Sequence, residues 1–194
     1  MSGLRKSTQP PHLGEVGVLV DGCRVVLPER EALWWVKTLA ANPPGCWWTV
    51  LPMGVRDSDR RWLLERLLDE GDPLDLDQVE GLAEQVVGAV CGVNMWAAHR
   101  ICQMVYGNWM MFDGWAASKG FDPLGAPIGR VLSAAYAWRM SHCEKKSDVD
   151  KVDMHIWGPP PMRMASGRVR DQTPVGWSDE AEEAAFMAAL GMSR

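Results

Sequence analysis

The chain has 194 residues and a net charge of −5 at pH 7, with 47% apolar and 23% charged residues. This length suits one domain with appendages, and the apolar content is sufficient for a buried core, which argues against a wholly disordered protein. The acidic balance argues against a general nucleic-acid binder, and no apolar run is long enough to span a membrane.

The cysteine and tryptophan contents point to a reducing compartment and to protein contacts. Five cysteines without a CxxC pair are most simply buried thiols in a cytoplasm. Residues 1–14 are polar and lack the apolar core of a signal peptide, so we expect them to form a flexible N-terminal arm. Eleven tryptophans are several times the ordinary number, and such rings fill cores or dominate interfaces between proteins.

A helical body with an N-terminal β-hairpin is predicted over residues 15–157. Residues 16–27 form two β-branched runs around Asp21-Gly22, a pair favoured in type I′ turns. The proline that follows predicts the start of a helix with acidic residues in its first turn. The apolar run at residues 47–51 is expected to add a third strand to the hairpin.

Helical periodicity and capping signals predict the remaining elements of the body. Asp75 and Asn94 each precede an apolar helical pattern and are expected to be N-caps. Further helices are expected at residues 60–71, 76–92, 95–107, 128–143 and 144–157, with one or two more turns after Asn108. The predicted fold class is mostly α (α+β), a domain of about five to six helices with a small N-terminal antiparallel β-sheet and an extended C-terminal tail.

The composition changes after the body. Residues 158–176 are rich in proline and glycine and are predicted to be a linker. Residues 177–194 are acidic at first and then apolar, which predicts a C-terminal amphipathic helix. A helix of this length is marginal alone in water, so its apolar side requires a partner, either this body or another chain.

The sequence carries no complete signature of a catalytic, nucleotide or calcium site. The acidic run at residues 69–77 lacks oxygen ligands at EF-hand spacing, and neither a glycine-rich phosphate loop nor a GxSxG motif occurs. Cys102, His142 and Cys143 have the residue types of a nucleophilic pair or a metal site, so a small hydrolase or metal-binding protein remains an alternative. His142 and Cys143 would point about 100° apart on a helix, however. We expect no enzyme activity, no cofactor and no metal.

Two adjacent tryptophan pairs, at 34–35 and 47–48, indicate an interaction surface. Neighbouring residues on a helix or strand face different ways, so one ring of each pair can enter the core while the other faces a partner. The C-terminal helix offers further apolar side chains for contact. The candidate partner-binding residues are Trp35, Trp48, Trp177, Phe186, Met187 and Leu190.

The order of these segments resembles a group of phage proteins. The segments are ALWWVKTLA, WWTVLP, LLDEGDPLDLDQVEGLAEQVVG, MWAAHRICQMVYGNWMMFDGW and KGFDPLGAPIGRVLSAAYAW, followed by the proline-rich tail. Together they resemble small tail assembly chaperones and minor structural proteins of tailed phages of actinobacteria. The resemblance covers about residues 16–157 and, more faintly, the tail.

The resemblance implies a non-enzymatic bacteriophage morphogenesis protein without a cofactor. A tail assembly chaperone would hold the long tape-measure protein until tail subunits polymerise around it, in the cytoplasm of the infected host. The alternative is a minor capsid or tail structural protein retained in the virion. The implied partners are other phage structural or assembly proteins, and self-association is also compatible with these surfaces, whereas membranes and nucleic acid are not expected partners.

Overall fold

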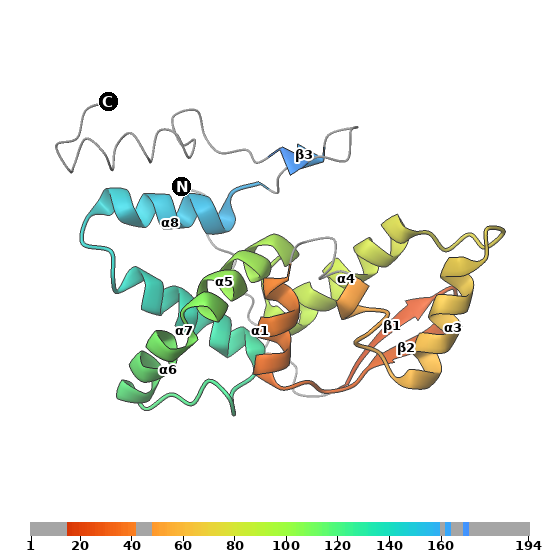
Figure 1. Ribbon diagram of the computed structural model, residues 1–194, viewed down its shortest axis with the longest axis horizontal. Coiled ribbons are helices and arrows are strands. Elements are labelled where there is room, and N and C mark those ends of the chain that lie inside the picture. Colours follow the sequence, from red (N-terminus) through yellow and green to blue (C-terminus); the bar gives the residue numbers. More distant parts are fainter. Residues whose placement is uncertain (1–14, 42–47, 160–161, 164–168, 171–194) are drawn as a thin grey trace. The chain divides into compact units, whose positions relative to one another are not determined.

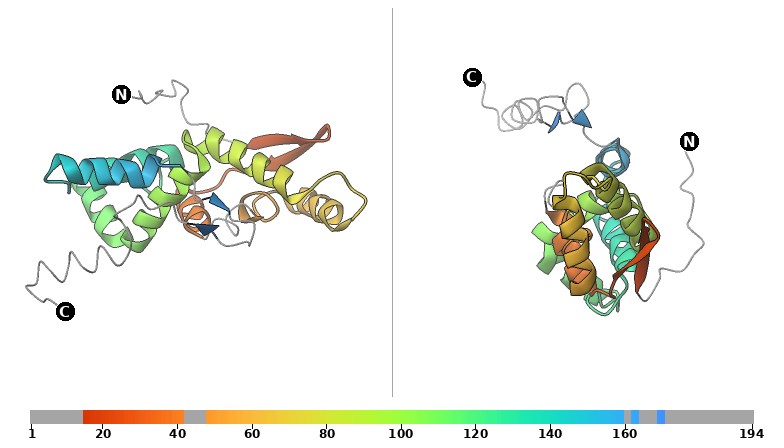
Figure 2. Two further views of the ribbon diagram at one scale, coloured as in Figure 1. Left: turned by 90° about the horizontal axis from the view of Figure 1, so that it is seen from above. Right: turned by 90° about the vertical axis from the view of Figure 1, so that its right-hand side faces the viewer.

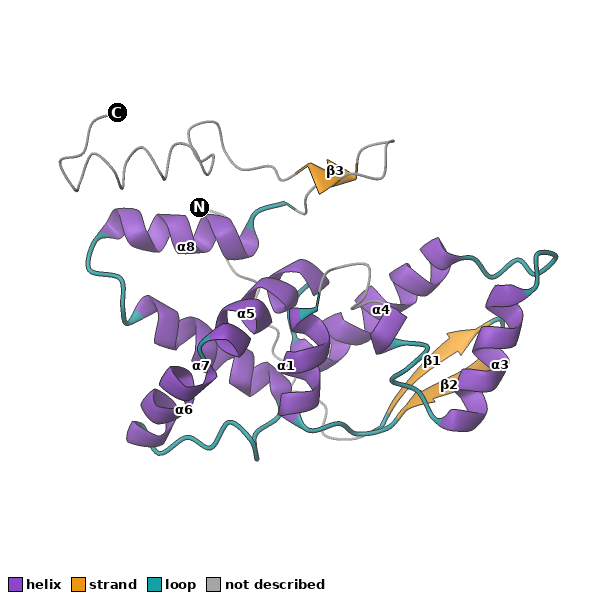
Figure 3. Cartoon of the chain, in the orientation of Figure 1, coloured by secondary structure: helices purple, strands orange, loops and turns teal. Residues whose placement is uncertain are grey.

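The structure is a computed structural model, which describes residues 15–41, 48–159, 162–163 and 169–170 (Figure 1). The chain divides into two compact units, Met1–Trp157 and Gly158–Arg194. Helices dominate the first unit (Figure 3), so the mostly helical class with a small N-terminal antiparallel sheet is confirmed. The predicted N-terminal arm (1–14) and C-terminal helix (177–194) lie outside the described residues.

The predicted hairpin is confirmed. Strand β1 (Val16–Val20) pairs antiparallel with β2 (Cys23–Leu27). The turn between them has positive φ at both central residues, 47° at Asp21 and 80° at Gly22. This is the backbone that a two-residue type I′ turn requires, and it explains why an Asp-Gly pair is found there.

The predicted third strand is wrong, because residues 48–50 form a helical turn instead. The outer edge of β2 is already occupied by other groups. The backbone N–H of Val26 donates to Asp59 Oδ2 at 2.9 Å, and the carbonyl of Val26 accepts from the Arg56 N–H at 3.1 Å. Since these bonds replace those of a neighbouring strand, the sheet keeps two strands, and Val50 and Leu51 fill the core from the helical turn and the residue after it.

Seven labelled helices of nine residues or more follow the hairpin among the described residues, more than the five to six expected. They are α1 (Ala32–Ala40), α3 (Asp57–Leu68), α4 (Leu76–Cys91), α5 (Met95–Gly107), α6 (Trp109–Ser118), α7 (Ile128–Met140) and α8 (Lys146–Trp157). The number is higher because the segment after Asn108 forms a helix of 10 residues rather than one or two turns.

Local side chains set several helix ends. Asp75 Oδ1 accepts from the Gln78 N–H at 2.8 Å, and Asn94 Oδ1 accepts from the Ala97 N–H at 2.8 Å, so both predicted N-caps are confirmed. Helix α1, by contrast, begins four residues after Pro28, and its first turn contains no acidic residue. The prediction that acidic residues would lie in that first turn is therefore wrong.

Helix α5 lies at the centre of the first unit, where it contacts α1, α4, α6, α7 and α8. The hairpin packs against α4 through β1, and one continuous apolar core runs from the hairpin to α8. The hairpin and α3 lie at one end of this unit, and α6 lies at the other, as Figure 1 and the left view of Figure 2 show.

In the second unit, β3 (Met162–Arg163) pairs antiparallel with β4 (Val169–Arg170). This short ladder lies inside the stretch predicted to be a linker. No helix in the described parts of either unit is long and apolar enough to cross a membrane.

Candidate interaction surface

Three exposed apolar side chains lie where α5 meets α6. Tyr106 comes from the last turn of α5, and Met110 and Met111 come from the first turn of α6. They are 54%, 88% and 63% exposed, respectively, and we call these three residues the methionine corner. Large apolar side chains that gather on a surface commonly mark a site of protein contact.

The backbone at the methionine corner is held by Asn108. Its N–H donates to the Val105 carbonyl at 3.0 Å, and its side-chain amide donates to the Met104 carbonyl at 2.9 Å. Its own carbonyl accepts from the N–H groups of Met111 and Phe112, each at 3.0 Å. One residue thus satisfies carbonyls at the end of α5 and N–H groups at the start of α6, which fixes the angle between the two helices.

An aromatic cluster supports the methionine corner from inside. The Phe112 side chain is completely buried, and its ring centroid lies 5.9 Å from that of Trp109, 6.4 Å from Trp115 and 5.7 Å from Trp138. Edge-to-face and stacked rings at these separations add to the stabilisation that burial provides. Helix α6 is therefore anchored by its inner face, and its outer face is preformed before any partner binds.

The methionine corner is almost free of charge. Residues 101–118 include a single charged residue, Asp113. Methionine is unbranched and polarisable, so it adapts to partners of differing shape, and tyrosine adds a rigid ring with a polar tip. Such a surface is suited to the apolar face of a helix.

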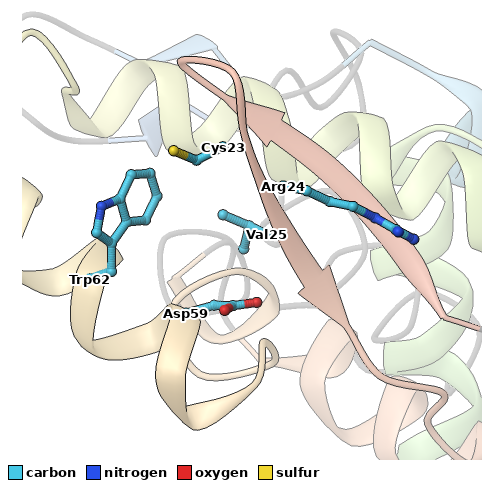
Figure 4. Close-up of a pocket in the computed structure, with 5 residues that line it drawn as sticks. All are labelled: Cys23, Arg24, Val25, Asp59 and Trp62. Atoms are coloured by element: carbon cyan, nitrogen blue, oxygen red, sulfur yellow. The ribbon is translucent and has the colours of Figure 1, made fainter.

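A second candidate is a cavity of about 200 Å³ between β2 and α3, which is lined by Cys23, Arg24, Val25, Asp59 and Trp62 (Figure 4). The Arg24 side chain points away from Trp62, so it is mainly the thiol, the valine and the indole that line the space. Asp59 is engaged with the Val26 N–H, and the lining includes no histidine to activate the thiol. The cavity therefore lacks a nucleophile–base pair.

The two tryptophans of the 34–35 pair differ in burial. Trp35 is 3% exposed and belongs to the core, where its ring meets that of Trp34 edge-on at 5.0 Å. The prediction that Trp35 contacts a partner is therefore wrong, and Trp34 is the half-buried member. One ring of this pair does enter the core, as expected, but the choice between them depends on how α1 packs against α5.

The other predicted contact residues have different outcomes. Trp48 is 39% exposed, which leaves it available for contact. Trp177, Phe186, Met187 and Leu190 lie outside the described residues. The methionine corner was not predicted, although two adjacent methionines after the Gly107-Asn108 break, in a stretch with one charge, were a signal that could have located it.

The residues of the hydrolase or metal alternative are not brought together as a site. Cys102 is completely buried. The Nδ1 of His142 lies 2.8 Å from the Trp138 carbonyl, and the Cys143 Sγ–H donates to the Arg139 carbonyl at 3.6 Å, so both engage the end of α7. Within the described ranges, no group of three or more His, Cys, Asp or Glu side chains is placed to hold a metal ion.

One buried histidine has a structural role. His99 of α5 is 4% exposed, and its Nδ1 lies 2.5 Å from the Leu39 carbonyl in the last turn of α1. Burial is the main cause that lowers the pKa of His99 below its usual value, and the nearby charge of Arg100 acts in the same direction. The neutral ring thus satisfies a carbonyl at the helix end and ties α1 to α5.

Comparison of the chain with protein-family models, with curated proteins and with solved structures finds no match.

Proposed function

We propose that this chain is a non-enzymatic bacteriophage morphogenesis protein, most specifically a tail assembly chaperone that binds the tape-measure protein through the methionine corner. The resemblance of residues 16–157 to such chaperones suggests the class of protein. The observation that carries the proposal for this chain is the exposure of Tyr106, Met110 and Met111 on a preformed, uncharged surface.

The chemistry of the methionine corner suits a holding function. A tape-measure protein is long and helical, and its apolar helix faces aggregate unless they are covered. Flexible methionines can pack against helices that differ in sequence, because the side chains change rotamer at small cost. A small apolar surface also binds reversibly, which a chaperone needs in order to release its client.

The acidic charge of the chain supports the same function. A net charge of −5 keeps a complex with an apolar client soluble through repulsion between copies. The proposal includes location in the cytoplasm of the infected host, where the tape-measure protein is made.

Co-expression with the tape-measure protein tests the proposal. We expect this chain to keep the client in the soluble fraction and to co-purify with it. The variant Met110→Glu/Met111→Glu should reduce the recovered complex about tenfold or more, because burying an unpaired carboxylate is costly. Met154→Glu is the matched control, since Met154 is 56% exposed on α8. Equal recovery with both variants would reject the methionine corner as the binding surface.

Mass spectrometry of purified particles separates a chaperone from a minor capsid or tail protein. A chaperone should be abundant in infected-cell lysate and missing from particles. A fixed copy number in the particle would instead assign the chain to the virion and would reject a transient holding function.

A further inference from the structure

The two edges of the β1–β2 hairpin differ in how their backbone groups are paired. The antiparallel register places Gly17 opposite Val26. Alternate pairs in such a ladder exchange no hydrogen bonds, and their N–H and C=O groups point away from the partner strand. Val26 belongs to such a pair, since it bonds to Asp59 and Arg56 outside the hairpin. Gly17 and, two residues further on, Leu19 therefore direct their backbone groups outward along the other edge.

This other edge, formed by β1, is open. Within the described part of the chain, no hydrogen bond reaches the outward N–H and C=O groups of Gly17 and Leu19. Gly17 is exposed, and Leu19 is 68% exposed. Proteins commonly protect an edge strand with a charged residue, a proline or a bulge, but β1 reads VGVLV and its register is continuous. Such an edge is a template on which another strand can pair.

The sequence of β1 matches an antiparallel copy of itself. A two-fold axis at Val18 places this residue opposite its own copy and Val16 opposite Val20, so each valine meets a valine. Cross-strand pairs of β-branched side chains stabilise a sheet. The same axis places Gly17 opposite Leu19 of the second copy. Their outward groups then form four hydrogen bonds, because each copy contributes two N–H donors and two carbonyl acceptors.

The pairing also covers the exposed Leu19 side chain. Residues directly opposite each other place their side chains on the same face, and Gly17 has none to oppose the leucine. The Arg24 side chain runs across Gly17, with its Cγ 3.4 Å and its Nε 2.6 Å from the position that a Cβ would take. Leu19 of the second copy therefore packs on the apolar stem of Arg24, whose charged end stays in solvent.

We infer that two copies of this chain form a dimer in which β1 pairs antiparallel with β1 of the second copy. A second copy fits this edge because it brings a strand whose backbone groups are free and whose side chains match. The dimer has a four-stranded sheet with β2 at each outer edge, where Asp59 and Arg56 already bond to Val26. Each copy uses its open edge once, so association stops at two. The dimer does not depend on the proposed chaperone function.

The charges at the ends of β1 are compatible with this register. It brings Glu15 opposite Asp21 of the second copy. Each carboxylate is paired within its own copy, Glu15 with Arg56 and Asp21 with Arg66, which offsets the repulsion between them. Added salt screens the remaining repulsion between two chains of net charge −5. The dimer should therefore persist at high salt.

Sedimentation of the full-length protein tests the inference. The average mass should rise with protein concentration from one chain to two and no further. Leu19→Pro should raise the Kd of the dimer about thirtyfold or more, because each dimer loses two hydrogen bonds. Proline is tolerated on an edge strand where the N–H faces solvent, so the variant should keep its fold, which circular dichroism checks. Met154→Glu, on α8, is the control and should dimerise as the parent protein does.

Disulfide formation tests the register. In a background in which Cys23 and Cys143 are serine, Val18→Cys should give a disulfide-linked dimer under mild oxidation. Residues that face each other in such a pair lie close enough to be bridged. Val16→Cys is the matched control, since Val16 is also half-buried on the same face. Residue 16 faces residue 20, so the two copies of residue 16 lie about 13 Å apart.

Three results would overturn the inference. The first is a parent protein that stays monomeric at its highest soluble concentration. The second is a folded Leu19→Pro variant that dimerises as tightly as the parent. The third is equal cross-linking of Val18→Cys and Val16→Cys. Leu19→Pro keeps the methionine corner and should still bind the tape-measure protein, so failure of the dimer and failure of the proposed function are distinguishable.

Discussion

The methionine corner and residues 68–77, which join α3 to α4 and which we call the acidic end, both expose apolar side chains beside helix ends, but different interactions support them. Behind the methionine corner lies Phe112, which is completely buried among three tryptophan rings. The acidic end depends on Arg66, which joins the hairpin turn to the α3–α4 connection through Asp21 and Asp72. Packing of buried rings is insensitive to added salt, whereas ion pairs near the surface are screened.

This difference shows that exposed apolar residues on one small unit need not serve the same purpose. A neutral surface backed by packed rings can accept helices of many sequences. A charged surface held by ion pairs selects partners by their charge and responds to ionic strength. Four sets of variants test how the two surfaces and the core between them are stabilised.

The largest effect is expected at the support of the methionine corner. Phe112→Ala removes a completely buried ring and should lower the free energy of unfolding by about 3–5 kcal/mol, measured by urea denaturation. Met110→Ala is the control, because an 88% exposed side chain should change stability by no more than about 0.5 kcal/mol. Equal losses in the two variants would contradict the supporting role of the aromatic cluster.

The next effect concerns pH and the contact between α1 and α5. Because burial lowers the pKa of His99, the unfolded chain binds a proton that the folded chain rejects. The free energy of unfolding should therefore fall as pH decreases below the ordinary histidine pKa of about 6.5. His99→Gln should remove this part of the pH dependence, whereas His142→Gln, at an exposed position, should retain it. A pH dependence that survives in His99→Gln would place its origin elsewhere.

Helix capping should contribute similarly in α4 and α5. Asn94→Ala removes the cap of α5, and Asp75→Ala removes the cap of α4, so each should cost about 1 kcal/mol in urea denaturation. Asp75→Asn keeps an oxygen acceptor but removes a charge from the acidic end. The free energy of unfolding of Asp75→Asn should stay close to that of the parent protein. This result would show that the capping hydrogen bond, and not the charge, stabilises α4. A full loss in Asp75→Asn would show that the charge, not the cap, stabilises α4.

The smallest effect is expected at Arg66. Arg66→Met removes the ion pairs with Asp21 and Asp72 but keeps an apolar stem beside Trp62. The Asp21 carboxylate is exposed, and Asp72 keeps its bond from the Leu74 N–H, so the lost ion pairs should cost little, and salt screens them. Thermal unfolding should show a modest decrease at low salt that shrinks at high salt. Arg61→Met, at an exposed neighbour, is the control, and a salt-independent decrease in Arg66→Met would indicate lost packing instead.

Elements defined by near neighbours were predictable from the sequence. The Asp21-Gly22 turn and the caps at Asp75 and Asn94 depend on contacts within three residues, so their residue types are informative without any knowledge of the fold. The run at residues 47–51 was not predictable in this way. A short apolar run suits a strand or a helical turn equally, and the edge of β2 was taken by Asp59 and Arg56 from farther along the chain.

The candidate surface depended even more on distant contacts. Both tryptophans of the 34–35 pair satisfy the same helical pattern, and only the packing of α1 places Trp35 inside and Trp34 at the margin. Packing also decides the exposure of Met110 and Met111. Phe112 and its tryptophan neighbours occupy the inner side of α6 and leave the methionines outside. Composition and local spacing thus determined the helical class, the hairpin and the caps, because those features depend on short-range hydrogen bonds and on φ preferences. Tertiary packing decided which apolar side chains became surface, because burial depends on which helices meet across the core.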